Sequence, residues 1–243
     1  MTNLIIDLGN TALKLFVFDE QNILFSSIVE DYDRLLSDII YAIDKYKIEN
    51  AIISSVRDDD KNVIDGLNSS VNLLQMSTRL KLPIELLYET PNTLGQDRLA
   101  AVCGASVLYP NKNVLVIDVG TAITYDILTD DNKYLGGTIS LGICTRFRAL
   151  HNFTGKLPLL GINKNIDGVY GKTTNEAIIL GVQNGIINEV RGVIAAYDKE
   201  FHNLLVVFTG GDSFFFDNLI KNRIFAVPNL TVFGLNKILK LNV

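Results

Sequence analysis

A short turn occurs twice in this chain, each time directly after a run of apolar residues. The first copy reads DLGNTALKL at residues 7–15, and the second reads DVGTAITYD at residues 118–126. Each copy combines an acid at the exit of a buried strand with a glycine and a threonine. Because the same pattern recurs at corresponding places, we expect two halves built on one plan.

The first half is predicted to form a three-stranded meander followed by alternating helices and strands. Its strands are expected in LIIDLG, ALKLFVF and ILFSSIV, where apolar runs are separated by turn residues. Apolar residues then recur at helical spacing over Tyr32–Lys47. A strand at 50–56, a helix around 60–80 and a helix from Gly95 to Tyr109, closed by Pro110, complete this half.

The second half repeats this order. Its meander is expected in NVLVIDVG, AITYDILT and KYLGGTIS, followed by a long helix over Thr174–Glu200. The strand LLVVFTGG and a helix beginning at Asp212 come next. Two copies of this order imply two similar α/β lobes, residues 1–110 and 111–243, with a central cleft. No linker rich in Pro, Gly or Ser separates the copies, so we expect them to pack as one rigid unit with a hinge.

Charge and composition limit the classes of partner. The net charge of −5 and pI near 5.1 provide no basic footprint for nucleic acid. Mean hydropathy is +0.24, but no apolar run approaches the roughly 18 residues of a membrane span. The N-terminus lacks a secretory pattern, which favours a cytoplasmic protein with no membrane partner.

The cysteines and histidines do not suggest a metal centre. Cys103 and Cys144 are not a CxxC pair and are expected to be small buried hydrophobic residues. His151 and His202 have no partner at metal-ligand spacing, which argues against zinc.

The repeated turn has a structural and a functional interpretation. A Gly-Asn hairpin corner needs no ligand, because both residues tolerate the left-handed backbone of tight turns. The functional interpretation adds backbone N–H groups opened by glycine, threonine hydroxyls, hard carboxylate oxygens for a cation and one mobile positive charge. The residues concerned are Gly9, Gly120, Thr11, Thr121, Asp7, Asp118 and Lys14. Two such turns facing each other would hold a polyphosphate with its metal.

The duplicated meander with DLGNT and DVGTA resembles the actin-like ATPase and sugar-kinase superfamily, which has a duplicated ribonuclease H-like fold. In that superfamily two phosphate loops close on ATP. VVFTGGD at 206–212 is similar to its third element, a strand followed by two glycines that leave room for adenosine. The structural alternative for Gly210, Gly211 and Asp212 is a strand end followed by a helix N-cap.

The segment YETPNTLGQDRLAAVCGA at 88–105 narrows the family. It is similar to the Tyr-x-x-Pro-x-x-Leu-Gly-x-Asp-Arg stretch of type III pantothenate kinases. GGTIS, ALHNFTGKLP and TTNEAIILG match as well, so the resemblance covers almost the entire chain. It implies ATP-dependent phosphorylation of pantothenate to 4'-phosphopantothenate, the first step of coenzyme A biosynthesis.

The residues support part of this assignment. Asp97 and Arg98 fall in the expected first turn of a helix, where the macrodipole favours an ionised carboxylate. Arg98 offers a planar fork suited to a carboxylate, although a solvated arginine is the common alternative. The resemblance implies that Asp97 is the base that accepts the proton of the pantothenate hydroxyl. It also implies an acceptor site made of Tyr88, Gly95, Gln96, Asp97, Arg98 and Thr174. Thr173 and Glu176 have capping-box spacing, which leaves Thr174 free for this role.

By the same resemblance, the nucleotide site comprises Asp7, Leu8, Gly9, Asn10, Thr11, Ala12, Leu13, Lys14, Thr121, Gly210 and Gly211. Asp118 matches a residue that binds a monovalent cation, K⁺ or NH₄⁺, and Mg²⁺ would arrive with ATP, with Asp7 as its candidate ligand. The family forms homodimers, so a homodimer is expected. One departure is Leu141, where the family commonly has proline, and we expect a more mobile loop there.

Two alternatives remain at this point. One is another actin-like kinase that acts on a sugar or small acid, which would share both turns but has no reason to carry residues 88–98. The other is a non-catalytic nucleotide-binding regulatory protein. Retention of Asp7, Asp97, Arg98 and Asp118 argues against it, because unpaired acids in a cleft are costly to keep.

Overall fold

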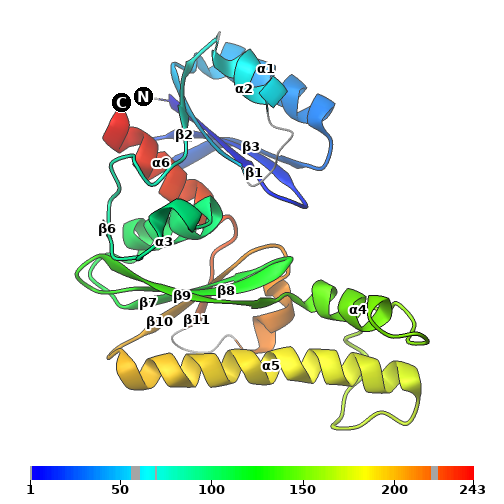
Figure 1. Ribbon diagram of the computed structural model, residues 1–243. Helices are drawn as coiled ribbons and strands as arrows, with labels where there is room; N and C mark the ends of the chain where they lie inside the picture. Colours follow the sequence, from blue (N-terminus) through cyan, green and yellow to red (C-terminus); the bar gives the residue numbers. More distant parts are fainter. Residues whose placement is uncertain (1, 56–60, 69, 220–223) are drawn as a thin grey trace. The chain divides into compact units, whose positions relative to one another are not determined.

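The structure is a computed structural model and describes residues 2–55, 61–68, 70–219 and 224–243 (Figure 1). These residues form two compact units. The first contains Met1–Asn111, Leu128–Gly136 and Asn229–Val243, and the second contains Lys112–Ile127 and Gly137–Pro228. The C-terminal residues therefore group with the N-terminal ones, whereas the sequence suggested one division near residue 110. The lobe boundaries 1–110 and 111–243 stay a prediction.

The first unit is built on a five-stranded sheet. Its strands are β1 (Thr2–Leu8), β2 (Leu13–Asp19), β3 (Asn22–Val29), β4 (Asn50–Ser55) and β5 (Asn72–Gln75), in the order β3-β2-β1-β4-β5. The predicted antiparallel meander β1-β2-β3 is confirmed, and β4 and β5 join it in parallel. Helices α1 (Tyr32–Tyr46) and α2 (Lys61–Asn68) cover one face of this sheet, and their apolar residues close a core with β1, β2 and β4.

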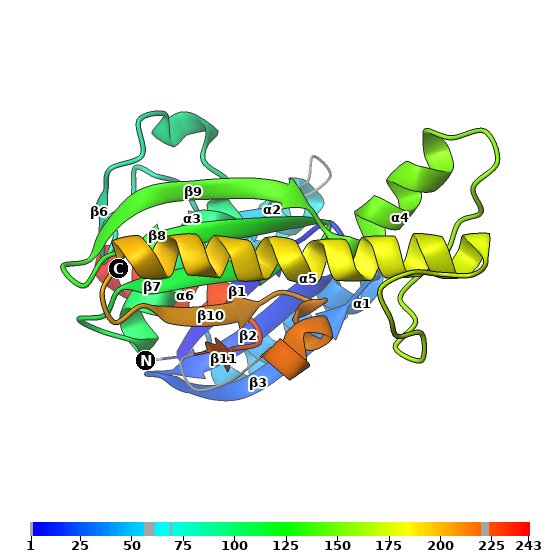
Figure 2. The same cartoon turned by 90° about the horizontal axis from the view of Figure 1, so that it is seen from below.

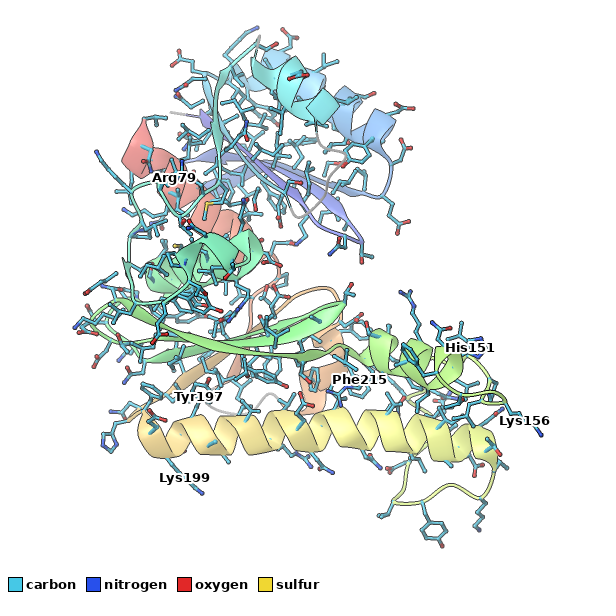
Figure 3. The ribbon with its side chains drawn as sticks, viewed as in Figure 1. Arg79, His151, Lys156, Tyr197, Lys199 and Phe215 are labelled. Atoms are coloured by element: carbon cyan, nitrogen blue, oxygen red, sulfur yellow. The ribbon has the colours of Figure 1, made fainter. Side chains whose placement is uncertain are left out.

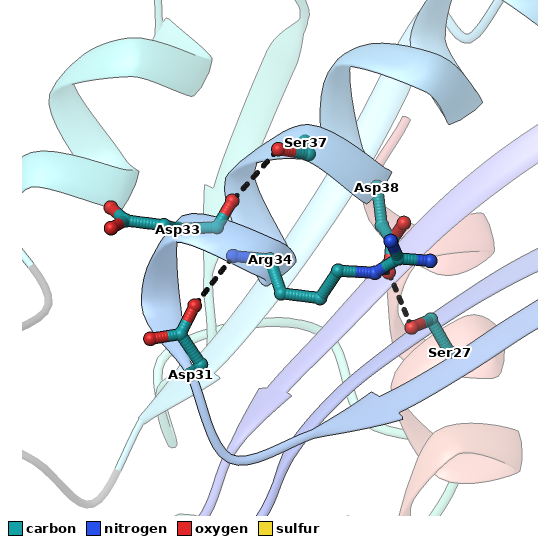
Figure 4. A network of polar contacts seen from close by, with 6 residues as sticks. All are labelled: Ser27, Asp31, Asp33, Arg34, Ser37 and Asp38. Atoms are coloured by element: carbon teal, nitrogen blue, oxygen red, sulfur yellow. Dashed lines mark hydrogen bonds and ion pairs between the residues drawn. The ribbon is translucent and has the colours of Figure 1, made fainter.

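A polar network fixes α1 on β3 (Figure 4). The Ser27 hydroxyl donates to Asp38 Oδ2 at 2.6 Å, and Arg34 Nε reaches the same oxygen at 3.3 Å. Asp31 caps the helix by accepting from the Arg34 N–H at 2.8 Å. Asp38 is buried, and these two donors satisfy Oδ2 of the carboxylate that the packing removes from water.

The helix predicted around 60–80 is wrong in length. The N–H groups of Ser70 and Val71 both donate to the Leu67 carbonyl, which ends α2, and the chain then enters β5. The ladder that β5 forms with β4 gives residues 72–75 hydrogen-bond partners that a longer helix would forgo.

Two helices lie on the other side of the first sheet and cross closely. They are α3 (Gln96–Leu108), where helix and bounds agree with the prediction, and α6 (Leu230–Asn242), which the sequence analysis did not foresee. A Cβ at Gly104 would collide with the Leu230 carbonyl oxygen, and one at Gly234 with the Ala100 carbonyl oxygen. Glycine at both positions lets the two backbones touch.

The second sheet repeats the strand order. Its strands include β7 (Val114–Val119), β8 (Ala122–Leu128), β9 (Lys133–Leu141), β10 (Leu205–Thr209) and β11 (Ile224–Ala226), arranged β11-β10-β7-β8-β9. Counted along each half, both sheets place the third, second, first, fourth and fifth strands side by side. The duplicated α/β plan is therefore confirmed. In addition, β6 (Glu85–Leu86) pairs in parallel with the start of β9.

Helix α5 (Thr174–Glu200) has the predicted bounds, and the capping box of Thr173 and Glu176 is present. It runs along the sheet and extends past the sheet, where it lies beside α4 (Ile143–Asn152) (Figure 2). Helix α4 was not predicted. Figure 3 shows Tyr197 of α5 and Phe215 directed toward the sheet, where both pack on the core, and Lys199 directed away. The helix expected from Asp212 is instead the 3-10 segment η2 (Ser213–Leu219), introduced by hydrogen bonds between residues three apart.

Cys103 is buried, as predicted, whereas Cys144 is only half-buried. Among the residues that the structure describes, no helix is long and apolar enough to span a membrane.

Candidate active site

Asp7 ends β1 and is buried in the first unit, with 7% of its surface exposed. The Thr231 hydroxyl of α6 donates to its Oδ2 at 3.1 Å, and Lys14 Nζ lies 3.5 Å from the same oxygen. Burial raises the pKa of Asp7, the Lys14 charge and the Thr231 hydrogen bond lower it, and the charge of Asp97 raises it again. Asp7 and Asp97 therefore share one electrostatic environment.

Ser54 stands beside Asp7 in the sheet, because it is the register partner of Asp7 on β4. Its hydroxyl is buried and has no hydrogen-bond partner among the described residues. A buried unpaired hydroxyl costs about 1–3 kcal/mol, and such a group is commonly completed by a water or ligand. Of these two hydroxyl groups, that of Thr231 is hydrogen-bonded to Asp7 and that of Ser54 has no hydrogen-bond partner among the described residues.

The two repeated turns are alike in geometry and correct one expectation. The Gly9 N–H donates to the Ala12 carbonyl at 3.0 Å, and the Gly120 N–H donates to the Ala122 carbonyl at 2.9 Å. These N–H groups close the turns. They are therefore not open to an anion, and the expectation that they would be open is wrong. The first turn is one residue longer than the second, because its hydrogen bond spans three residues along the chain instead of two.

The tip of each turn is the part that faces solvent. Asn10, Thr11 and Thr121 are exposed, whereas Leu8 and Leu13 are buried in the core. Thr121 is also tied to the following loop, because its carbonyl accepts from the Gly142 N–H and the Thr145 hydroxyl.

The loop at Leu141, where the family commonly has proline, is also held by a hydrogen bond. The Leu141 carbonyl accepts from Arg146 Nε at 2.8 Å. The greater mobility expected for this loop stays a prediction.

Asp118 ends β7 and packs against Gly210, which has a φ of +90°. A Cβ at Gly210 would collide with Asp118 Oδ1 and the Val119 carbonyl oxygen. Asp118 Oδ1 and the Val119 carbonyl oxygen, which accepts from the Asp212 N–H at 3.0 Å, thus lie close to Gly210, where only glycine fits. The Asp118 carboxylate is a hard oxygen donor of the kind that suits an alkali or alkaline-earth cation. Gly211 borders open space, since a Cβ there would meet no atom within 4 Å.

The acceptor segment is assembled at the start of α3. Gly95 is the N-cap, and the Asp97 carboxylate accepts from the Arg98 N–H at 2.8 Å. A Cβ at Gly95 would lie 2.6 Å from Asp97 Oδ1, so glycine makes room for this carboxylate. Gln96 is half-buried in the same turn.

Arg98 is buried, with 6% of its surface exposed, and is therefore not the solvated arginine of the structural alternative. Its guanidinium lies 5.7 Å from the centre of the Tyr88 ring, at cation–π distance. Tyr88 in turn stacks on Tyr134, with ring centres 6.1 Å apart, and its ring lies 3.5 Å from the position of a Cβ on Gly136. The sequence analysis missed Tyr134; the only available signal was its place two residues before Gly136.

Thr174 lies in the second unit, in the wall of a mostly apolar pocket of about 790 Å³ between α4 and α5. Arg146 also lines this pocket and forms an ion pair with Glu189 of α5. Glu189 accepts a further hydrogen bond from the buried Tyr125 hydroxyl at 2.8 Å. Periodicity gave no signal for this network, because its members lie on three elements far apart in the sequence.

The described residues contain no group of three or more His, Cys, Asp or Glu side chains placed to hold a metal ion. The first unit brings together Asp7, Lys14, Asp97, Arg98 and Tyr88, and the second unit brings together Asp118 and Gly210.

Comparison with known proteins gives a consistent result. The sequence model of the family described as type III pantothenate kinase matches residues 3–196. Type III pantothenate kinases from Christiangramia forsetii and Bacteroides fragilis are 42% and 43% identical to the chain, covering 99% of it and 98% of each relative. A solved structure from Sinorhizobium meliloti, whose description names a 2-dehydro-3-deoxygalactonokinase, has a TM-score of 0.63 at 12% identity, covering 97% of both chains. This likeness in fold, with the repeated strand order, confirms the predicted actin-like ATPase fold.

Proposed function

The chain belongs to the type III pantothenate kinase family, and we propose from this membership that it transfers the γ-phosphoryl group of ATP to pantothenate. The product is 4'-phosphopantothenate, and the reaction is the first step of coenzyme A biosynthesis. The observation that carries the proposal is the packing of Asp97, Arg98 and Tyr88 in the unit that also holds Asp7. These groups match the two needs of the reaction, a hydroxyl acceptor and a phosphoryl donor.

On the acceptor side, Asp97 orients the primary hydroxyl of pantothenate and accepts its proton. Phosphoryl transfer through a loose transition state asks little of a base, so orientation is the larger part of this role. Arg98 binds the carboxylate of pantothenate with its planar fork. Tyr88 restrains that fork in advance, which reduces the entropy lost on binding. Gly95 and Gln96 complete the acceptor residues of the first unit, and the role of Thr174 stays a prediction.

On the donor side, ATP binds along residues 7–14, with Asn10 and Thr11 at the exposed tip. The roles of Thr121, Gly210 and Gly211 in nucleotide binding stay predictions. Lys14 supplies a positive charge beside the phosphates. Mg²⁺ accompanies the nucleotide and neutralises charge on the triphosphate. Asp7 fits this ion, because Mg²⁺ at a nucleotide is bound through one or two carboxylates together with phosphate oxygens and waters.

A monovalent cation, K⁺ or NH₄⁺, is assigned to Asp118. The support is the Asp118 carboxylate, a hard oxygen donor whose Oδ1 lies close to Gly210. Replacement of Asp118 by asparagine is therefore expected to weaken the dependence of turnover on potassium.

We also propose a homodimer and a cytoplasmic location, where ATP is available, with no nucleic acid or membrane as partner. The dimer is supported by large apolar side chains exposed at the end of α4 and in the segment between α4 and α5, among them Phe153 (89%), Val169 (94%) and Tyr170 (75%). Light scattering after gel filtration measures the mass directly, and a monomer at all concentrations would contradict the dimer.

A coupled ADP-release assay tests the function. Purified protein is expected to release ADP with pantothenate, more rapidly with potassium, and Asp97→Asn is expected to lower kcat far more than it raises KM. Asp44→Asn, an exposed aspartate on α1, is the matched control. ATP binding without turnover would favour a regulatory protein, turnover only on a sugar would favour another kinase of this fold, and an active Asp97→Asn enzyme would remove the role of Asp97.

A further inference from the structure

The C-terminal helix α6 holds β1 at both ends. At the start of the strand, Asn3 Nδ2 donates to Asn236 Oδ1 at 2.9 Å, and both residues are buried. At the end of the strand, the buried Thr231 hydroxyl donates to Asp7 Oδ2 at 3.1 Å. A strand fixed at both ends presents its terminal carboxylate in one orientation.

The same helix also holds the element that carries Asp97. Gly104 of α3 lies against the Leu230 carbonyl, and Gly234 of α6 lies against the Ala100 carbonyl. Such backbone contact leaves no space for sliding without steric overlap. Helix α6 is therefore in direct contact with both elements that bear an acid of the site.

The contacts of Asp7 divide its two oxygens. Thr231 and Lys14 both approach Oδ2, and no protein partner is recorded for Oδ1 among the described residues. On the neighbouring strand, the buried hydroxyl of Ser54 is also without a partner. One oxygen of Asp7 is thus held by the protein, while the other is left for a ligand.

We infer that Thr231 is a positioning residue for the magnesium–nucleotide complex: its hydroxyl fixes Asp7 Oδ2 so that Oδ1 is presented to the bound Mg·ATP. The inference rests on the proposed role of Asp7. It assigns to the C-terminal helix a part in nucleotide binding, although that helix contains none of the residues of the repeated turns. A purely structural Thr231 would contribute to the stability of α6 and leave nucleotide affinity unchanged.

The test uses the full chain and isothermal titration calorimetry with Mg·AMP-PNP, a non-hydrolysable nucleotide, so that binding is measured without turnover. Thr231→Val keeps the shape and removes the donor, whereas Thr231→Ser keeps the donor. Because a hydrogen bond to a charged group contributes more than a neutral one, Thr231→Val is expected to weaken binding about tenfold or more. Thr231→Ser is expected to stay within about threefold of wild type, and the KM for pantothenate is expected not to move.

Thr2→Val is the matched control. Thr2 is also on β1 in the first unit, and its hydroxyl donates to the Tyr46 carbonyl at 3.0 Å, away from Asp7. This variant loses one hydrogen bond of the same kind, so its unfolding temperature is expected to fall as in Thr231→Val, while its affinity for Mg·AMP-PNP stays at the wild-type value. If Thr231→Val does not fold, Thr231→Cys, which keeps a weak donor, is measured in its place and is expected to give an intermediate loss.

The outcomes are separable. Wild-type affinity in Thr231→Val, or an equal loss in the serine and valine variants, overturns the positioning role. Asp7→Asn is measured in parallel: if it binds Mg·AMP-PNP as tightly as wild type, the proposed role of Asp7 is wrong. If Asp7→Asn weakens binding and Thr231→Val does not, the proposed function stands and the inference about Thr231 fails.

Discussion

Replacement of Gly234 by alanine tests the close crossing of α3 and α6. A Cβ at this position would overlap the Ala100 carbonyl oxygen and lie 2.7 Å from the Gly104 nitrogen and 2.9 Å from the Ala100 carbonyl carbon. Non-bonded heavy atoms prefer separations of about 3.5–4.0 Å, so the helices must separate by roughly 1 Å. All three obstructing atoms belong to the α3 backbone and cannot move by a change of rotamer.

Two effects of opposite sign act on stability. Alanine in a helix interior gains about 1 kcal/mol over glycine, whereas overpacking of a core costs about 1–3 kcal/mol and occasionally more. Because backbone atoms obstruct the new methyl group, we expect the upper end of that cost and a net loss of about 2 kcal/mol. For a chain of this size the loss corresponds to a fall in Tm of about 4–8 °C.

The assay is thermal unfolding followed by circular dichroism, together with ADP release. Gly192→Ala is the matched control, because Gly192 lies inside α5 and a Cβ there would meet nothing within 4 Å. It gains the helix term alone, so its Tm should rise by about 2–4 °C. Since α3 carries Asp97, a displacement of about 1 Å is also expected to reduce kcat of Gly234→Ala by on the order of 100-fold. A Gly234→Ala enzyme as stable and as active as the Gly192→Ala enzyme would refute the reasoning.

Three further substitutions have defined expected outcomes. Asp7→Asn should raise the unfolding temperature, because burial raises the pKa of Asp7 and its ionised form weakens the fold at neutral pH. The same substitution should abolish phosphorylation, because it removes the carboxylate proposed to bind Mg²⁺. Burial also raises the pKa of Glu189, but hydrogen bonds from Arg146 and Tyr125 hold it below the ordinary 4.5. Ionised Glu189 therefore contributes its full stabilisation above pH 4.5, and this stabilisation is lost as the pH falls through the lowered pKa. Glu189→Gln should make the stability of the protein depend less on pH in this acid range. Arg98→Lys should raise the KM for pantothenate about tenfold, because lysine lacks the planar fork.

Each of these outcomes has a contrary result. A lower unfolding temperature in Asp7→Asn would mean that the Lys14 and Thr231 contacts outweigh burial. For Glu189→Gln, the stability is measured as the urea midpoint of unfolding between pH 3 and 7. If its dependence on pH is unchanged, other carboxylates are responsible for it. An Arg98→Lys enzyme with altered kcat and unaltered KM would place the arginine at the transferred phosphoryl group instead of the pantothenate carboxylate.

The sequence was a sufficient guide wherever local pattern determines structure. Both meanders, the bounds of α5 and its capping box follow from alternation, helical periodicity and the Thr173–Glu176 spacing. The duplication followed from the repeated turn, and the common strand order of the two sheets bears it out. The family was also assignable, because the segment at 88–98 resembles a motif of type III pantothenate kinases, and the comparison with known proteins confirms that family.

Features that depend on contacts distant in sequence were not predictable. The helix expected around 60–80 ends early because β5 finds its partners on β4, and the pattern of residues 72–75 does not contain that information. The grouping of α6 with the first unit depends on Gly104 and Gly234, two glycines 130 positions apart. The hydrogen bonds of the Gly9 and Gly120 N–H groups depend on the backbone conformation of each turn, which the residue types do not determine.

The energetics of Asp7 connect these observations. A carboxylate buried at a strand end is unfavourable for folding, and the chain has placed one cation and one hydroxyl, Lys14 and Thr231, on a single one of its oxygens. Two donors on one oxygen compensate only part of the burial, as the raised pKa indicates. Partial compensation is the arrangement expected where a bound cation supplies the remainder, so the effect that distinguishes Thr231→Val from Thr2→Val is a loss of nucleotide affinity and not a fall in unfolding temperature.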